Sequence, residues 1–117
     1  MIKPKGFPKR ARLTKRFEFL RIKNGAVTEV GVLAIIDQKS NALGYCRLGI
    51  TVLRKFGKSH VRNRFKRAVR EAFRHFDWRS ASFDIHVRPR AKAHDAKAKK
   101  VMEEVSHILD SMVYGKK

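Results

Sequence analysis

The most regular pattern of apolar and polar positions in the chain runs from Val61 to Phe76, with the sequence VRNRFKRAVREAFRHF. At about 100° per residue, an α-helix over this segment places the two kinds of side chain on opposite sides. The apolar side consists of Val61, Phe65, Ala68, Val69, Ala72, Phe73 and Phe76. The polar side is centred on Asn63, Lys66, Arg67, Arg70 and Arg74, with Arg62 and Arg64 at its borders. The pattern predicts a helix that packs on a sheet and exposes a basic stripe.

The segments before this helix give weaker signals. Residues 1–12 hold two of the three prolines and five basic residues, which predicts a flexible basic arm. Thr14 is a typical N-cap residue, and it predicts the start of a short helix that ends before Asn24-Gly25. Gly57 and Ser59 predict the turn and the N-cap of the basic helix.

Three stretches have the character of β-strands. The segment 27–37 is rich in Val, Ile and Leu, and its GVLAII is apolar at both odd and even positions, as in a strand covered on two faces. YCRLGITV alternates apolar and other residues, which predicts a half-exposed strand. Gly49 lies on its outward side, where another group can approach the backbone closely. SFDIHVRPR alternates in the same way and ends at Pro89.

The last part of the chain predicts an amphipathic helix, because apolar residues recur there at helical spacing. They are Val101, Val105, Ile108 and Met112, with Leu109 and Val113 alongside. Together the patterns predict a helix, two or three strands, a helix, a strand and a helix. With the apolar segment 27–37 counted as more than one strand, the order is α-β-β-β-α-β-α, an α+β fold of one sheet packed with helices, and a single domain over residues 13–115.

Charge indicates the kind of partner. The chain of 117 residues contains 29 Lys and Arg against 10 Asp and Glu, a formal net charge of +19. Such an excess favours a polyanionic partner, with a nucleic acid first and an anionic membrane surface second. The longest apolar run, Val32–Ile36, is far below the roughly 20 residues of a membrane span. With no secretory signal and one cysteine, Cys46, we expect a cytoplasmic protein.

The sequence offers little for catalysis. The ten acids are scattered, and the five histidines show no metal-ligand spacing, so we expect neither catalytic nor metal-binding residues in this chain. Gly57-Lys58-Ser59 ends like a phosphate loop, but Val52 stands where that motif requires glycine.

The basic segment favours RNA. From Arg54 to Arg79 there are ten basic residues and two acids, whereas a merely solvated face usually mixes both signs. Arginine suits phosphate because its planar fork donates two hydrogen bonds. Neither a helix-turn-helix pair nor a basic region with heptads is present, so RNA recognised by shape fits better than DNA.

Three segments, in this order and spacing, resemble a known family: RLTKRFEFLRIKNG, RLGITVLRKFGKSHVRNRFKRAVREAFR and FDIHVRPR. The family is the bacterial ribonuclease P protein subunit, and the resemblance covers roughly residues 12–114. Its most specific part is Arg62-Asn63-Arg64 followed by Lys66-Arg67 and Arg70-Glu71.

The resemblance implies a function in which this chain does no chemistry. A catalytic RNA subunit removes the 5′ leader of precursor tRNA with magnesium that the RNA mainly holds. The basic helix and the loop before it then contact this RNA through Arg54, Lys55, Lys58, Arg62, Asn63, Arg64, Lys66, Arg67, Arg70 and Arg74. A cleft between the first helix and the sheet holds the single-stranded leader, with the VLAII strand as its floor, through Arg12, Phe17, Phe19, Val32, Ala34 and Arg88.

The resemblance also implies a ribosomal protein S5 domain 2-like fold with a mixed sheet and a left-handed βαβ crossover, against the usual right-handed rule. This sequence departs from the family pattern at two places that concern the leader cleft. Ala34 stands where some relatives have an aromatic residue, and the first-helix segment is one residue shorter near Ile22 and Lys23 than in many members. An alternative function is a ribosomal or ribosome-assembly protein that binds rRNA. A protein-only nuclease is a third possibility, which would require a carboxylate cluster that the sequence does not show.

Overall fold

The computed structural model describes residues 11–23 and 25–114 of the chain. Its elements follow the predicted order. The helices are α1 (Arg16–Lys23), α2 (Ser59–His75) and α3 (Ala98–Tyr114), and the strands are β1 (Val27–Val30), β2 (Ala34–Ser40), β3 (Arg47–Ile50) and β4 (Phe83–Pro89). Two short 3-10 helices are η2 (Arg54–Phe56) and η3 (Ala91–Asp95).

The four strands form one mixed sheet in the order β1-β2-β4-β3. β2 is antiparallel to both β1 and β4, and β3 is parallel to β4, with Leu48 opposite Ile85. The chain passes from β3 through α2 to the neighbouring parallel strand β4, as the resemblance implies for the crossover. The hand of this crossover stays a prediction.

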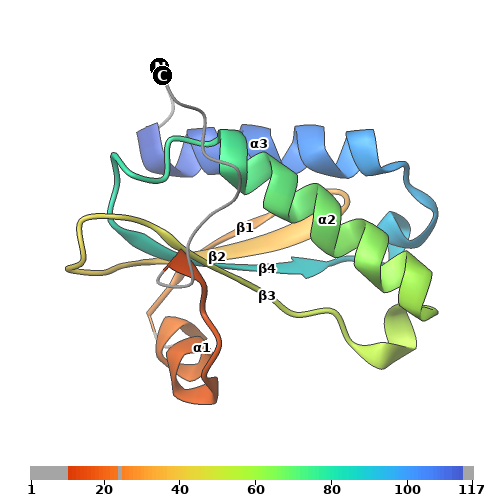
Figure 1. Cartoon of the computed structure of the whole chain (residues 1–117), viewed down its shortest axis with the longest axis horizontal. Helices are drawn as coiled ribbons and strands as arrows, with labels where there is room; N and C mark the ends of the chain where they lie inside the picture. Colours follow the sequence, from red (N-terminus) through yellow and green to blue (C-terminus); the bar gives the residue numbers. More distant parts are fainter. Residues whose placement is uncertain (1–10, 24, 115–117) are drawn as a thin grey trace.

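The sheet separates two unequal layers (Figure 1). α2 and α3 cover one face side by side, and the short α1 lies on the other. The main core lies under α2 and α3, where β2 and β4 contribute alternate residues such as Ile36 and Val87, both fully buried. Trp78, which follows α2, closes this core at 2% exposure and stacks on Phe73 with ring centroids 5.8 Å apart.

The predicted strand over 27–37 is two strands, because a turn at Gly31–Leu33 interrupts it. The Glu104 carboxylate of α3 accepts the backbone N–H groups of Val32, Leu33 and Ala34 at 3.1, 2.8 and 2.9 Å. A Cβ at position 31 would clash with this carboxylate, so a larger residue there would displace the Glu104 side chain from the turn. A contact between residues some 70 positions apart therefore sets the turn.

Both N-cap predictions were wrong by a residue. α1 begins at Arg16, and the N–H groups of Thr14 and Lys15 donate to the Glu18 carboxylate, each at 3.0 Å. α2 begins at Ser59 itself, so Lys58 occupies the N-cap position without a capping side chain. The Ser59 hydroxyl instead accepts from the Arg62 guanidinium at 3.2 Å.

The predicted basic arm falls outside the described residues at 1–10, but its last two residues belong to the fold. Ala11 is fully buried, and Arg12 pairs with Leu48 of β3 in an isolated bridge. The folded domain therefore extends at least two residues before the predicted boundary at 13. In the described part of the chain, no helix combines the length and apolar character needed to cross a membrane.

Candidate nucleic-acid interface

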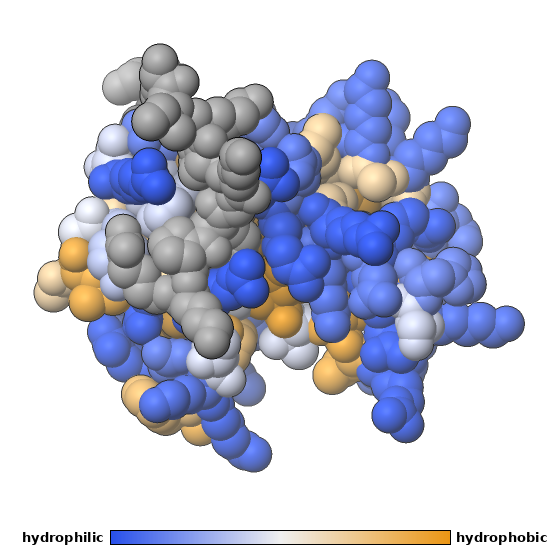
Figure 2. Space-filling model, in the orientation of Figure 1, coloured by the Kyte–Doolittle hydropathy of each residue, from blue (hydrophilic) through white to orange (hydrophobic). Residues whose placement is uncertain are grey.

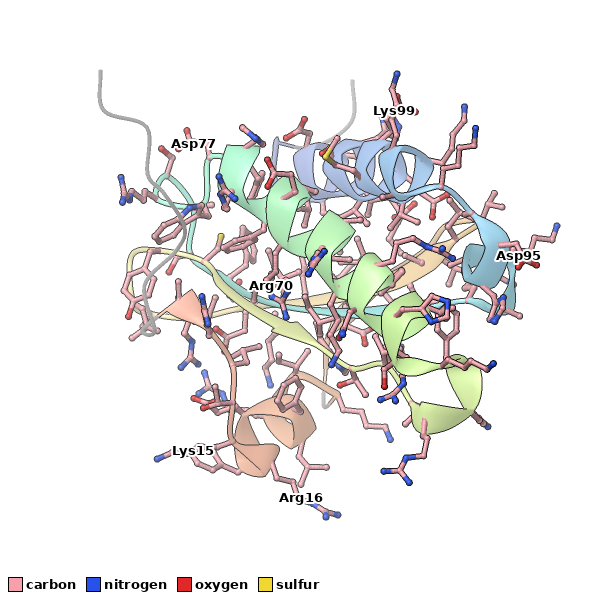
Figure 3. The ribbon with its side chains drawn as sticks, turned by 45° about the vertical axis from the view of Figure 1, so that its right-hand side comes forward. Lys15, Arg16, Arg70, Asp77, Asp95 and Lys99 are labelled. Atoms are coloured by element: carbon pink, nitrogen blue, oxygen red, sulfur yellow. The ribbon has the colours of Figure 1, made fainter. Side chains whose placement is uncertain are left out.

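The outer face of α2 has the predicted helical phase. The seven residues assigned to its apolar side, from Val61 to Phe76, are all buried. Asn63, Arg67 and Arg70 on the opposite side are exposed, and Lys66 is half-buried. Figure 3 shows Arg70 well separated from Lys99, which lies on α3. The apolar stripe thus fixes which side chains point outward.

Three of the ten predicted RNA-binding residues are engaged inside the protein. The Arg62 Nε donates to the Gly57 carbonyl at 3.1 Å, and Arg64 Nη2 donates to the His94 carbonyl at 2.6 Å. Arg74 pairs with Glu71 at 2.9 Å. Arg62 and Arg64 lie at the borders of the stripe, as predicted, and there they tie α2 to the loops beside it. In this structure the two guanidinium groups hold the loops at Gly57 and His94 against α2.

The side chains of the other predicted residues have no partner within the described parts of the chain. These are Arg54 and Lys55 of η2, Lys58 before α2, and Asn63, Lys66, Arg67 and Arg70 of α2. Hydrophilic side chains gather over α2 on the side that faces the viewer in Figure 2. Because these six cations follow one another on η2, the loop and α2 without a described acid paired to them, their mutual repulsion falls when a polyanion binds. We call this surface, residues 54–70 on the outer side of η2 and α2, the basic face.

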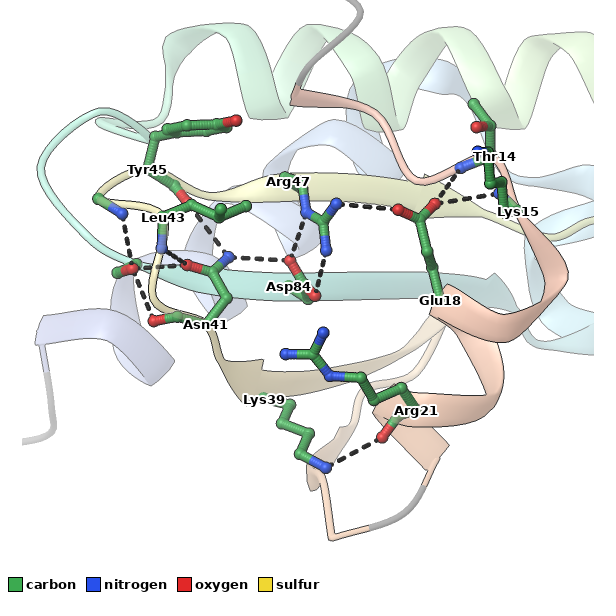
Figure 4. Close-up of polar contacts among 12 residues, drawn as sticks. Thr14, Lys15, Glu18, Arg21, Lys39, Asn41, Leu43, Tyr45, Arg47 and Asp84 are labelled. Carbon is green, nitrogen blue, oxygen red and sulfur yellow. Dashed lines mark hydrogen bonds and ion pairs between the residues drawn. The ribbon is translucent and has the colours of Figure 1, made fainter.

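On the other side of the sheet, α1 is attached through an ionic network (Figure 4). Arg47 of β3 forms two hydrogen bonds to Asp84 of β4, each 2.8 Å, and an ion pair with Glu18 of α1 at 2.9 Å. Asn41 also donates to Asp84 at 2.8 Å. Arg47 therefore links the helix to two parallel strands. No local pattern in the sequence indicates these pairs.

The network shifts the pKa values of Glu18, Asp84 and Arg47. Burial alone would raise the pKa of Glu18, but the backbone N–H groups of Lys15 and Thr14 and the Arg47 guanidinium outweigh it, and the pKa is lowered. Burial likewise opposes ionisation of Asp84, whereas hydrogen bonds from Arg47 and Asn41 lower its pKa overall. The pKa of Arg47 is raised, first by its hydrogen bonds to Asp84. All three groups are therefore charged at neutral pH.

Phe19 of α1 packs directly on the sheet. Its ring lies edge-on to His86, with centroids 4.9 Å apart, and covers Gly49, the position at which the sequence predicted close approach of another group. A Cβ at Gly49 would clash with the Phe19 ring and lie 3.0 Å from the Leu13 Cβ. Phe17, by contrast, is 62% exposed.

We expect Gly49→Ala to destabilise the fold by about 1–3 kcal/mol, because the new methyl group overpacks against Phe19. Chemical denaturation measures this loss. In the double variant Gly49→Ala/Phe19→Ala, the destabilisation should fall short of the sum of the single effects by at least about 0.5 kcal/mol, since the clash is gone. Strict additivity would contradict the contact.

A row of polar side chains crosses the same face of the sheet. Asp37 of β2 accepts from the Thr28 hydroxyl at 2.6 Å and from Arg88 of β4 at 3.0 Å. His86 is 2.7 Å from the Thr51 hydroxyl. Burial, and then the charge of Arg88, lower the pKa of His86 against the opposing effect of Asp37. We call this surface, between α1 and the sheet, the cleft face.

The residues predicted for the leader cleft do not all lie on the cleft face. Phe19 and Arg88 do. Val32 is exposed in the β1–β2 turn, beside Glu104 of α3. Ala34 is fully buried on the opposite face, in the core under α3, so its prediction as a cleft residue was wrong. The prediction failed because GVLAII is apolar at both parities, and the sequence did not show which parity faces which layer. Likewise, Val32 and Leu33 lie in the turn and form no strand floor.

Chemistry-bearing side chains do not cluster. Among residues 11–23 and 25–114, no three His, Cys, Asp or Glu side chains come together as a metal site. Cys46 is fully buried, and burial raises the pKa of its thiol to about 11, so it is a poor nucleophile.

Comparison with known proteins gives a consistent result. The sequence model of the Ribonuclease P family matches residues 7–113. The ribonuclease P protein component of Chlamydia felis is 45% identical over 86 residues, which are 73% of this chain and 62% of that protein. The protein from Chlamydia abortus is 39% identical over 110 residues, 93% of this chain and 78% of that protein. The match thus spans less than two thirds of the Chlamydia felis protein.

Solved structures agree in fold. A Staphylococcus aureus RNase P protein mutant with defective mRNA degradation activity superimposes with a TM-score of 0.82 at 28% identity, covering 89% of each chain. The RNase P protein of Thermotoga maritima, in complex with 1-(4-fluorophenyl)-2-thiourea, gives a TM-score of 0.75 at 36% identity, covering 84% of this chain and 96% of that one.

Proposed function

The chain belongs to the ribonuclease P protein family, and on this premise we propose that it is the RNA-binding protein subunit of ribonuclease P. In this function it assists a catalytic RNA in removing the 5′ leader of precursor tRNA. The basic face binds the catalytic RNA, and the cleft face binds the leader. The chain itself contributes no reacting group.

The basic face is the observation that carries this proposal. Arg54, Lys55 and Lys58 lie on η2 and just before α2, and Lys66, Arg67 and Arg70 lie on α2; none of these side chains is paired with a described acid. Arg and Lys contacts to phosphates fix the position of a nucleic acid without reading its sequence. α2 is anchored by six buried side chains and so holds Lys66, Arg67 and Arg70 at fixed spacing, which suits the backbone of a folded RNA.

The cleft face suits a single strand. Phe19 and the more exposed Phe17 offer aromatic rings, on which unpaired bases stack. Arg88 lies two positions along β4 from His86, which contacts Phe19, and adds a guanidinium that pairs with Asp37. Ala34 is buried and takes no part. The ionic network around Arg47 holds α1 at a fixed position over the sheet and so sets the width of this binding surface.

We propose that magnesium is held mainly by the RNA. Carboxylates around the cleft face are engaged, Glu18 and Asp84 with Arg47 and Asp37 with Arg88, and Glu71 of α2 pairs with Arg74. A carboxylate already neutralised by a guanidinium is a weak ligand for a divalent ion that prefers oxygen donors. Magnesium held by RNA phosphates would supply stabilisation of the negative charge that develops during cleavage.

Replacing Arg67 and Arg70 together by alanine should weaken binding to the catalytic RNA by about tenfold or more, because two charge-assisted phosphate contacts are lost. The stability of the free protein should be unchanged, since both side chains are exposed. The slope of log affinity against log salt should fall by about 0.7 to 0.9 for each lost contact. Filter binding at several salt concentrations measures both effects.

The matched control is Lys99→Ala/Lys100→Ala at the start of α3, which removes the same net charge away from the basic face.

Reconstitution supplies the functional test. The protein should stimulate cleavage of precursor tRNA by a bacterial catalytic RNA at limiting magnesium. The Arg67→Ala/Arg70→Ala variant should give the same stimulation only at a higher protein concentration. An equal loss of RNA affinity in both double variants would mean that binding depends only on the total charge of the protein and not on the basic face. Failure to stimulate any bacterial catalytic RNA, together with recovery on ribosomal subunits, would favour the rRNA-binding alternative.

A further inference from the structure

The basic face consists of two parts that the fold anchors to different extents. The first part lies on α2, which six buried side chains hold on the sheet, and consists of Lys66, Arg67 and Arg70. The second part lies on η2 and in the segment before α2, and consists of Arg54, Lys55 and Lys58. No residue of η2 is buried, and neither η2 nor the start of α2 has a capping side chain. The position of the second part relative to the first therefore depends on contacts outside the core.

Two arginines of α2 supply such contacts. Arg62 donates from Nε to the carbonyl of Gly57, the residue that follows η2, at 3.1 Å. Arg64 donates from Nη2 to the His94 carbonyl of η3 at 2.6 Å. Hydrogen bonds from a charged donor are roughly twice as strong as those between neutral groups. The two guanidinium groups thus fix η2 and η3 against the same helix.

The His94 side chain connects η3 to η2. Its ring lies edge-on to Phe56 of η2, with centroids 5.8 Å apart. Gly57 packs against the same ring so closely that an added Cβ would lie 3.0 Å from it. Because Arg64 holds the backbone of His94 and the His94 ring contacts η2, Arg64 also determines where η2 lies.

The environment of these two arginines differs from that of the outward cations. Arg62 and Arg64 are half-buried, whereas Asn63, Arg67 and Arg70 are exposed. A guanidinium has N–H donors in a fixed planar arrangement, so directing one edge at a backbone carbonyl leaves fewer donors for a phosphate. The spacing of basic residues in the sequence does not distinguish these two groups of arginines, but the contacts do.

We propose that Arg64 is a positioning residue for RNA binding. It fixes η3, and through His94 also η2, against α2, and so it sets the spacing between the two parts of the basic face. This inference rests on the proposed binding of RNA at the basic face. Cations that are already held at the required spacing lose little conformational entropy when RNA binds. Loss of the Arg64 contact therefore weakens RNA binding without removing a contact to phosphate.

The test compares Arg64→Met with Arg67→Met, since each variant removes one positive charge from α2 and keeps an unbranched side chain. Binding to a bacterial catalytic RNA is measured at several salt concentrations. Arg67→Met should lower the magnitude of the slope of log affinity against log salt by about 0.7 to 0.9. Arg64→Met should weaken the affinity about threefold or more, with the slope changed by less than about 0.3. Equal changes of slope in the two variants would mean that Arg64 contacts a phosphate, and would overturn the inference.

Hydrogen exchange of the free protein tests the contact with η3 directly. The amides of Ala93 and Ala96 donate to the carbonyls of Arg90 and Ala93, and the Val105 amide in the core of α3 serves as the internal reference. In Arg64→Met, Ala93 and Ala96 should exchange about fivefold faster or more relative to Val105, because η3 opens locally. In Arg67→Met this ratio should stay as in the wild type. An unchanged ratio in Arg64→Met contradicts the role of Arg64 in holding η3.

Gly57→Val disturbs the same contacts without changing any charge. The new side chain must displace the His94 ring, since the Cβ alone would already lie 3.0 Å from it. RNA affinity should fall about threefold or more with an unchanged salt slope, because the number of phosphate contacts stays the same. Wild-type affinity in this variant would mean that the position of His94 does not matter for RNA binding, and the inference would be wrong.

The two kinds of measurement separate this inference from the proposed function. If the wild-type chain bound no catalytic RNA, the proposed function would fail, while hydrogen exchange would still report whether Arg64 holds η3. If the wild type bound RNA and Arg64→Met behaved like Arg67→Met, the proposed function would stand and the positioning role would fail.

Discussion

Replacing Arg47 by methionine is expected to lower the free energy of unfolding by about 3–5 kcal/mol, because it leaves Asp84 charged, buried and without its main partner. The Asp84 side chain is only 3% exposed, and Arg47 supplies two of its hydrogen bonds. Methionine keeps much of the volume of the arginine stem, so the loss reports the charge and the hydrogen bonds rather than a cavity. Equilibrium denaturation in urea at pH 7 measures it.

The same network gives the fold a dependence on pH with a definite sign. The pKa values of Glu18 and Asp84 are lowered in the folded state, so their ionised forms stabilise it above the pKa values of the unfolded chain. That stability is lost as the pH falls below about 4 and both groups are protonated. The difference between wild type and Arg47→Met should therefore narrow on acidification.

Arg67→Met is the control for this prediction. It makes the same change at an exposed position on α2 without a described partner, and it should alter stability by less than about 0.5 kcal/mol. A similar small effect for Arg47→Met, or a difference from wild type that stays constant between pH 7 and pH 3, would mean that the pairs with Glu18 and Asp84 contribute little.

Replacing Phe65 by alanine is expected to destabilise the fold by about 3–5 kcal/mol, through the lost burial of the ring and the cavity that remains. Phe65 is 2% exposed and lies in the core between α2 and the sheet. Its ring also contacts Phe56, with centroids 6.0 Å apart, and Phe56 lines a cavity between η2 and η3. The denaturation midpoint in urea should therefore fall.

Phe17→Ala provides the comparison, since the same atoms are removed from a side chain that is 62% exposed on α1. This variant should lose less than about 1 kcal/mol of stability. Comparable losses at positions 65 and 17 would contradict the orientation of α2 on the sheet, and with it the assignment of the basic face.

The orientation of α2 was predictable because it depends on local periodicity. Every seventh or eighth residue of a helix returns to the same side, so the apolar positions from Val61 to Phe76 specify the buried side without knowledge of what covers it. The exposure of Asn63, Arg67 and Arg70 follows directly. The order of helices and strands was predictable for the same reason.

Other features depend on partners far away in the chain. The turn at Gly31–Leu33 exists because Glu104 accepts its N–H groups, and Arg64 is turned inward because the His94 carbonyl lies within its reach. Asp84 is a charged residue in a strand whose partner, Arg47, lies 37 positions away. Local composition and spacing do not indicate any of these pairs. The two helix starts also differ from the prediction, and the nearby polar groups are engaged elsewhere: Glu18 accepts from Thr14 and Lys15, and Ser59 accepts from Arg62.

The amino-acid sequence by itself determined the order of helices and strands, the buried and basic sides of α2, and the preference for an RNA partner. Helical periodicity and net charge are properties of the chain that do not depend on tertiary contacts. The tertiary structure alone decided that Ala34 faces the core, that Phe19 covers Gly49, and that η2 and η3 enclose a cavity. These features arise from strand pairing and side-chain contacts between distant segments, and only packing in three dimensions selects among the alternatives that local patterns leave open.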